Sequence, residues 1–236
     1  MTFGDLKLML AQQVNRSDME STWYPIWINR ALRRIQNDTS FTFMRSRADV
    51  TMAAGESSAT LPDDFKELTP EKSAITIVDP SLISQGVLAE LPCELTSREN
   101  MLNYRAATFV PSRPANVRGR LAGLPVYLDR RWSGVSGSTV STGGTTINIL
   151  DVTAEPLAFR VSYFAYLPAL ANDVDTNTLL LEYPDLVESK VKSIAFSALN
   201  DPVATNFELA SGKLLAEAVL DDKRRLNSGR VYRMGG

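Results

Sequence analysis

The chain has 236 residues, 44% of them hydrophobic and 22% charged, which is the balance of a globular protein that buries one sizeable core. The formal net charge of -2 at pH 7 argues against a generally basic nucleic-acid binder and against an acidic, disordered chain. No basic region precedes the short apolar stretch at the N-terminus, and no run approaches the roughly 18 apolar residues of a membrane span. We therefore expect neither a secretory signal nor a membrane partner.

Histidine is absent from the chain. The chain therefore lacks the commonest general base, the commonest transition-metal ligand and the usual partner of serine and cysteine nucleophiles. The single cysteine, Cys93, forms no internal disulfide and fits a reducing compartment, by default the cytoplasm. One thiol with carboxylates is also a poor ligand set for zinc. We expect no catalytic residue, no metal site, no cofactor and no enzyme activity.

Two helices are predicted at the N-terminus. The first covers about residues 3–14 and opens with a capping-box pattern at residues 2–5. The second carries one apolar stripe, with arginines largely on its other face, and ends near residue 37. Its start has two alternatives. A capping box at residues 17–20 begins it early, whereas Pro25 prefers the first turn of a helix.

The middle of the chain is predicted to be rich in strands. From about residue 41, short β-type runs are separated by Gly, Pro, Ser and Asp. One helix is expected to interrupt them after a capping box of Thr96 and Glu99. The expected strands cover residues 43–52, 58–61, 74–78, 125–129, 145–150 and 157–166.

Helical periodicity returns at Tyr183, where Pro184 suits a first turn. Asp201 and Pro202 are expected to cap a last helix that runs to about residue 226. The fold class predicted is α+β, with an antiparallel helical bundle built from the N- and C-terminal helix pairs and a β-rich middle insertion. The expected parts are the bundle at 1–40 and 169–226, the insertion at 41–168, and a flexible C-terminal tail at 227–236.

This order of features resembles the head-to-tail connector, or adaptor, proteins that join the portal to the tail in tailed bacteriophages and related gene transfer particles. The resemblance covers nearly the whole chain as a pattern. Its residues are the amphipathic opening helix, Trp27-Ile28-Asn29 with Ala31 and Ile35, the turn Leu61-Pro62-Asp63-Asp64-Phe65, the strand Val161-Ser162-Tyr163-Phe164, and Leu181-Glu182-Tyr183-Pro184 before the small-residue segment 193–198.

The resemblance implies a virion structural protein of the neck region, made in the host cytoplasm. Its partners are then a homo-oligomeric ring, typically twelvefold, the portal protein, and tail or tail-terminator proteins. Genomic DNA passes through the lumen without sequence-specific binding, the bundle builds the ring wall and the β-rich part faces the tail. A C-terminal extension commonly reaches the portal in this family, which by position maps to Arg230, Val231, Tyr232 and Arg233.

A second group of candidate residues is an arginine-rich stretch between residues 105 and 131, in the β-rich middle. Asp129 is the only acid of this stretch. Arginine forks suit phosphate and carboxylate partners, so the stretch either lines a DNA channel or pairs with a neighbouring subunit, unless these are solvated residues that guard strand edges. The stretch contains Arg105, Arg113, Arg118, Arg120, Arg130 and Arg131.

Other motifs have structural interpretations. Residues 133–144 are rich in glycine and serine but lack the ending of a P-loop, which predicts a flexible hairpin tip. The acid pairs at 63–64 and 221–222 are interpreted as a turn or cap and a charged last turn. The aromatic residues at 23–27 are expected to pack on the opening helix with partial exposure, and Cys93 to be a passive thiol.

The sequence is compatible with three functions. The first is the connector, which acts through subunit interfaces. The second is a tail-completion or tail-terminator protein, which the β-rich middle permits and four terminal helices disfavour. The third is a carboxylate-based lysis enzyme, which needs two carboxylates across a cleft, and the sequence shows no convincing pair.

Overall fold

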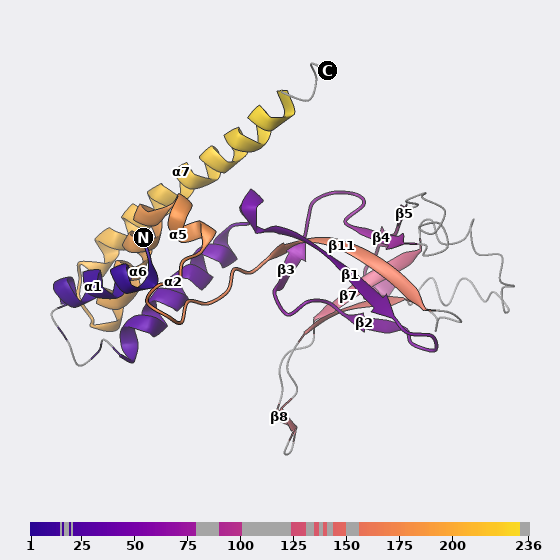
Figure 1. Cartoon of the computed structure of the whole chain (residues 1–236), viewed down its shortest axis with the longest axis horizontal. Helices are drawn as coiled ribbons and strands as arrows, with labels where there is room; N and C mark the ends of the chain where they lie inside the picture. The colour runs from indigo at the N-terminus through magenta and orange to yellow at the C-terminus, as the bar shows by residue number, and fades with distance from the viewer. Residues whose placement is uncertain are drawn as a thin grey trace, which may run out of the picture. The chain divides into compact units, whose positions relative to one another are not determined.

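The computed structural model describes residues 1–14, 16, 19, 21–78, 90–100, 124–130, 135–136, 139–140, 144–149 and 156–231, with only the backbone for 130, 135–136, 139–140 and 227–231. The chain is a mixed α+β protein that divides into two compact units. A helical unit contains residues 1–44 and 166–236, and a β unit contains residues 45–165 (Figure 1).

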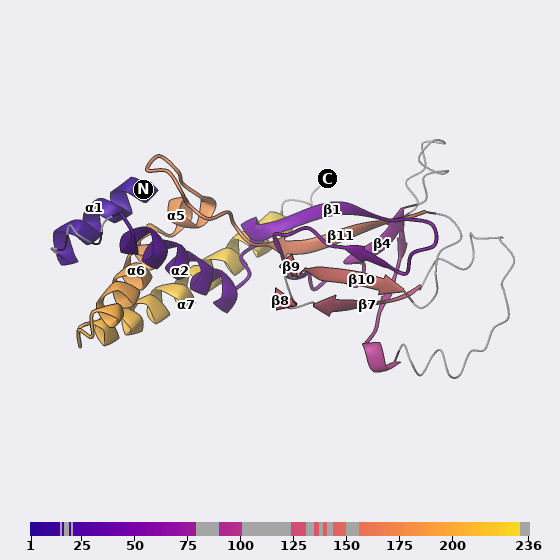
Figure 2. The ribbon, with the colours of Figure 1, turned by 90° about the horizontal axis from the view of Figure 1, so that it is seen from below.

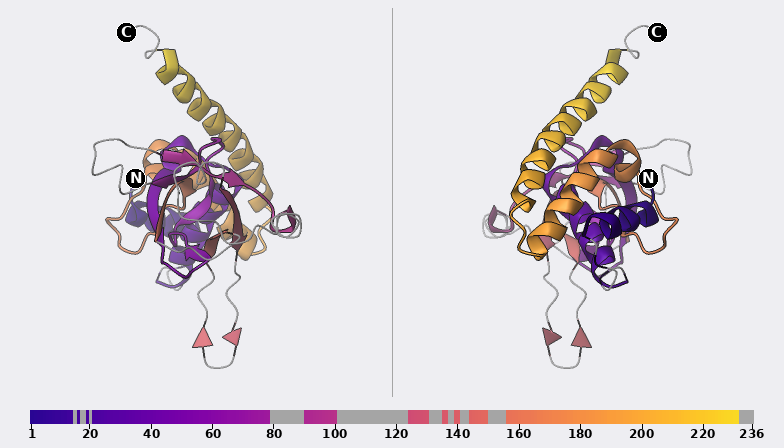
Figure 3. Two further views of the ribbon diagram at one scale, coloured as in Figure 1. Left: turned by 90° about the vertical axis from the view of Figure 1, so that its right-hand side faces the viewer. Right: turned by 90° about the vertical axis from the view of Figure 1, so that its left-hand side faces the viewer.

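The helical unit is built around α6, which packs against both α2 and α7, while α1 contacts α2 and α6. Figure 3 shows α7 lying beside α6, with its C-terminal turns extending past the other helices of this unit. The elements are α1 (Phe3–Val14), α2 (Trp23–Asp38), the 3-10 turn η2 (Thr42–Met44), α5 (Thr178–Glu182), α6 (Pro184–Ala198) and α7 (Ala204–Val231).

The first two helices begin where local chemistry satisfies their free N–H groups. The backbone N–H of Thr2 donates to Asp5 Oδ2 at 2.7 Å and the N–H of Asp5 donates to Thr2 Oγ1 at 3.3 Å, so the predicted capping box is confirmed. The early start predicted for the second helix from residues 17–20 is wrong, because α2 begins at Trp23. Pro25 is then its third residue, where a missing N–H removes no intrahelical bond.

The polar face of α2 binds the segment that follows the β unit. Asn29 donates to the carbonyl of Leu170 at 2.9 Å and accepts from its N–H at 2.8 Å. The buried Gln36 accepts from the N–H of Leu167 at 2.7 Å. These hydrogen bonds satisfy polar groups of both side chains, and they hold the segment that re-enters the helical unit against α2.

The C-terminal helices follow the predicted order with one correction. Pro184 occupies the first position of α6, as expected, and Asp201 accepts from the N–H of Val203 one residue before α7. The predicted end near residue 226 is wrong, because α7 continues to Val231 and takes in half of the segment expected to be a tail. Each residue added to a formed helix gains a hydrogen bond, which outweighs the cost of about 1 kcal/mol at Gly229.

The β unit contains two main sheets, which Figure 2 shows lying one over the other. One has the order β1-β11-β4-β5, with β3 also paired to β11, and the other has the order β2-β10-β7-β6. Their strands are β1 (Arg45–Met52), β2 (Ser58–Thr60), β3 (Phe65–Leu68), β4 (Ile75–Val78), β5 (Glu90–Pro92), β6 (Glu94–Leu95), β7 (Pro125–Arg130), β10 (Thr145–Ile149) and β11 (Leu157–Ala165).

Strand β11 organises the first sheet. It pairs along its length with β1, in the register Arg45↔Phe164, and its other edge pairs with β4 and then with β3. Side chains from both sheets, including Phe159 and Ile147, form one buried core. The chain crosses between the sheets at a turn containing Gly55, whose φ of 84° favours glycine, and at Cys93.

The sequence located most of these strands but missed some features. Residues 42–44 form a 3-10 turn, so the strand expected from 43 begins at Arg45. The short strands β3, β5 and β6 were not predicted. The helix expected after Thr96 has its first turn at residues 98–100, where the N–H of Asn100 donates to Ser97, and the remainder lies outside the described residues. In the hairpin predicted at 133–144, β8 (Val135–Ser136) pairs with β9 (Thr139–Val140).

Candidate functional site

The residues that the sequence assigned to partners mostly lie outside the described part of the chain. In the C-terminal segment, Arg230 and Val231 belong to the last turn of α7, and only their backbone is described. Tyr232 and Arg233 lie outside the described residues. In the arginine stretch, the backbone of Arg130 ends β7 opposite Thr145. Arg105, Arg113, Arg118, Arg120 and Arg131 lie outside the described residues.

The first acid pair and the cysteine have structural roles. Asp63 and Asp64 occupy the turn before β3, and Asp64 accepts a hydrogen bond from the hydroxyl of Tyr163 at 2.9 Å. Burial raises the pKa of the Cys93 thiol to about 12, which disfavours the reactive thiolate. Within the described ranges, no group of three or more His, Cys, Asp or Glu side chains is placed to hold a metal ion.

The second acid pair contacts two different partners. Asp222 accepts from the backbone N–H of Thr42 at 3.0 Å and from its hydroxyl at 2.7 Å. Asp221 forms an ion pair with Arg225 at 2.9 Å, and Arg225 also pairs with Glu182 at 2.5 Å. The adjacent carboxylates thus serve separate structural contacts, and Asp222 holds the segment that leads into β1.

The aromatic cluster at the start of α2 is divided between core and surface. Tyr24 and Trp27 are buried, whereas Trp23 is 49% exposed and Ile26 is 50% exposed. The rings of Trp23 and Trp27 lie 6.3 Å apart. The partial exposure expected of this cluster is therefore confirmed, and Trp23 with Ile26 provides apolar surface beside the polar face of α2.

Helix α7 leaves much of its own apolar surface uncovered. Leu209 is 64% exposed and Leu220 is 54% exposed. Eleven residues are close to three turns, so the two leucines lie on one side of the helix, with Gly212 and Ala216 between them. A methyl group placed on Gly212 meets no atom within 4 Å. We call Leu209, Gly212, Ala216 and Leu220 the α7 stripe.

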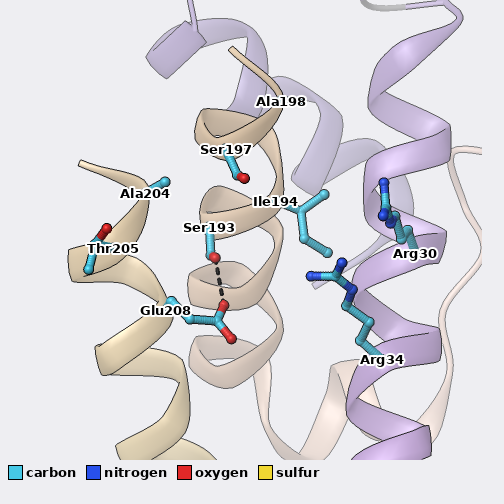
Figure 4. A pocket seen from close by; sticks show the side chains of 9 residues that line it. All are labelled: Arg30, Arg34, Ser193, Ile194, Ser197, Ala198, Ala204, Thr205 and Glu208. Carbon is cyan, nitrogen blue, oxygen red and sulfur yellow. Dashed lines mark hydrogen bonds between the residues drawn. The ribbon is translucent and has the colours of Figure 1, made fainter. Parts of the chain in front are cut away.

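A cleft of about 360 Å³ opens between α2, α6 and α7. Figure 4 shows its arginines on α2, its serines on α6, and its threonine and glutamate on α7, with α6 between the other two helices. Its lining residues are Arg30, Arg34, Ser193, Ile194, Ser197, Ala198, Ala204, Thr205 and Glu208.

The charges around this cleft are unequal. Glu208 accepts from Lys190 Nζ at 2.6 Å and from Ser193 Oγ at 2.6 Å, and these contacts lower the pKa of its carboxyl group. Arg30 and Arg34 are both exposed, and neither forms an ion pair within the described part of the chain. Arg34 also lowers this pKa through its charge, so three cations, Arg30, Arg34 and Lys190, stand against the one carboxylate of the cleft.

The comparisons with known proteins place this chain in a family. A family model described as "SU10 adaptor protein" matches residues 1–233. The chain belongs to this family of phage head-tail adaptors. No curated protein matches it.

Family membership makes this chain a structural component of a phage virion, and the family is not one of enzymes. An adaptor interacts with other virion proteins, so its exposed surfaces take the place of an active site. In the described residues, no helix is long and apolar enough to cross a membrane.

No feature of the sequence indicated the cleft between the helices. Arg30 and Arg34 were placed on the polar face of their helix, without a role. Ser193 was noted only as the start of the small-residue segment 193–198, and Glu208 was not singled out. One signal was present: the two arginines are four residues apart, a spacing that puts both side chains on one side of a helix.

Proposed function

We propose that this chain is the head-to-tail connector of its particle, forming a ring between the portal and the tail. The observation that carries the proposal is the family match over residues 1–233. A protein that acts by assembly needs surfaces that its own fold leaves uncovered, and the α7 stripe is such a surface.

In the proposed ring, twelve copies meet through their helical units, arranged as a bundle that forms the wall, and the α7 stripe of one copy contacts the next copy. The β unit faces the tail. Residues 230–233 reach the portal, and the arginine stretch between 105 and 131 contacts neighbouring subunits or lines the channel. Genomic DNA crosses the lumen without sequence-specific contacts, since sliding DNA must not be gripped.

The alternative is a tail-completion or tail-terminator protein of the same virion. It also acts through exposed surfaces, but it binds the tail first and the portal not at all. The two proposals therefore differ in the partner that the isolated chain recognises.

The test is negative-stain electron microscopy with size-exclusion chromatography of the chain alone and mixed with the portal encoded in the same genome. We expect closed rings, or portal rings that gain a second tier. A chain that stays monomeric, ignores the portal and binds tail tubes contradicts the connector and supports the terminator.

Two truncations separate the contributions of the C-terminal residues. A chain ending at residue 231 retains the whole of α7, whereas one ending at 226 also loses its last helical residues. If residues 230–233 contact the portal, the second truncation abolishes the second tier and the first weakens it. Ring formation by the chain alone serves as the control, because neither truncation alters the α7 stripe.

A further inference from the structure

The cleft between α2, α6 and α7 has the composition of a site for an anionic side chain. Its two guanidinium groups come from one helix, four residues apart, and point from the same side of α2. Neither has an ion-pair partner among the described residues. Arg34 interacts with Glu208 only through longer-range electrostatics. Guanidinium groups that form no ion pair, in a cleft with an excess of positive charge, favour a carboxylate or a phosphate.

The helix ends at the cleft do not alter this balance. Ala204 and Thr205 belong to the first turn of α7, and Ala198 is the last residue of α6. The positive end of one helix dipole therefore faces the negative end of another, each equivalent to roughly half a charge. Because these contributions oppose each other, the side chains decide the sign of the potential.

The walls of the cleft favour a carboxylate side chain over a DNA phosphate. Ile194, Ala198 and Ala204 supply apolar surface that suits the methylene groups of an aspartate or glutamate. The cleft is also bounded by three helices, whereas duplex phosphates lie on a broad convex surface.

We propose that this cleft receives a carboxylate side chain from a second copy of this chain. The α7 stripe continues along the same helix from Thr205 and Glu208, so a neighbour that covers Leu209 and Gly212 reaches the cleft. The choice of a second copy rests on the proposed ring. The recognition of a carboxylate does not, because it follows from the charges and walls of the cleft.

The first experiment measures the charge preference on the free chain. N-acetyl-glutamate amide is titrated while the arginine Nε–Hε signals are followed by NMR, with N-acetyl-glutamine amide as the neutral control. We expect saturable shifts of the Arg30 and Arg34 signals, with a Kd on the order of millimolar, that Arg34→Gln weakens. Equal shifts with the glutamine compound, or shifts only with inorganic phosphate or a DNA duplex, overturn the proposal.

The second experiment identifies the source of the carboxylate. We expect Arg30→Glu/Arg34→Glu to weaken ring formation at least tenfold in sedimentation velocity, because like charges then meet across the contact. Arg33→Glu is the matched control, since Arg33 belongs to the same helix but stacks on Tyr166, with its guanidinium 3.1 Å from the ring centroid. Thermal melts of each variant report any loss of folding.

The outcomes separate this inference from the proposed function. If the wild-type chain forms no ring, alone or on the portal, the connector proposal fails while the NMR titration still tests the cleft. If the charge-reversed chain forms rings as well as wild type does, the cleft inference is overturned and the connector stands. If it forms rings but no longer docks on the portal, the carboxylate belongs to the portal and the second copy is the wrong partner.

Discussion

Strand β11 and helix α7 bury their apolar residues in opposite ways. The nine residues of β11 pair with strands on both edges, and Phe159, Val161 and Tyr163 are buried in the core. The 28-residue α7 buries only Ser211 and Ala218 among its described side chains, and it exposes Leu209 and Leu220.

This difference shows which apolar surfaces a single chain buries by itself and which it leaves exposed. The β unit closes its core with its own two sheets. The helical unit leaves α7 partly covered, which is costly in a free monomer and useful in an assembly. Substitutions in β11 should therefore unfold the chain, and substitutions in the α7 stripe should leave it folded and unassembled.

The largest expected effect is in β11. Phe159→Ala removes a fully buried ring and leaves a cavity, so we expect a loss of about 3–5 kcal/mol in the free energy of unfolding. Urea denaturation followed by circular dichroism measures it. Leu209→Ala is the control in α7 and should change stability by less than about 0.5 kcal/mol. Equal losses would show that α7 is as tightly packed as β11.

The next effect concerns a buried cation of the helical unit. Lys190 is buried and pairs with Glu208, so Glu208→Ala leaves an ammonium group without its carboxylate. Because Glu208 itself is half exposed, we expect a loss of about 1–3 kcal/mol rather than the full cost of a buried charge. Glu217→Ala, an exposed acid on the same helix, is the control. Thermal denaturation distinguishes them.

A similar but smaller loss is expected at the contact between α7 and the segment before β1. Asp222→Ala removes the acceptor of the Thr42 backbone and hydroxyl groups, which we expect to cost about 1–2 kcal/mol. Amide hydrogen exchange should quicken at residues 40–44 before it changes in β11. Unchanged exchange at Thr42 would show that the carboxylate does not hold this segment.

The pH dependence of stability provides a subtler test of the same helical unit. Lys190 and Ser193 lower the pKa of Glu208 below its ordinary value of 4.5, so the folded state favours the ionised form. This contribution is complete above pH 4.5 and is lost as the pH falls through the lowered value. We expect the stability difference between wild type and Glu208→Gln to shrink on acidification below pH 4.5. A difference that is constant with pH contradicts this assignment.

The smallest effect on folding should accompany the largest effect on assembly. Leu209→Ser/Leu220→Ser changes two exposed residues, so we expect less than about 0.5 kcal/mol in stability. If the α7 stripe contacts the next copy, the variant should be folded in thermal melts and fail to form rings in electron micrographs. Rings of normal size would remove the stripe from the proposed interface.

The sequence predicted those elements whose signals are local. The caps of α1, the proline that opens α6 and the β-branched and aromatic run of β11 each act within a few residues. The four residues of β3 carry no comparable pattern, since they form a strand only by pairing with the far end of β11. The end of α7 was missed because the residues after 226 show no helical periodicity, whereas an established helix extends without it.

The cleft was less predictable than the fold. Its charge balance depends on α2, α6 and α7 meeting, and Arg34 and Glu208 are far apart in the sequence. No local rule brings such residues together. The side chains of the C-terminal arginines and of the arginine-rich stretch are not described, so their assigned roles remain predictions.

The pairing of β1 with β11 affects how such a chain can evolve. Arg45, the first residue of the β unit, is in register with Phe164, one residue before its last. Paired strands place such residues roughly 5 Å apart, so the entrance and exit of the β unit are neighbours. A short turn can bridge that distance. Recombination could therefore exchange one β unit for another of different shape without redesigning the helices, and the two units could diversify at different rates.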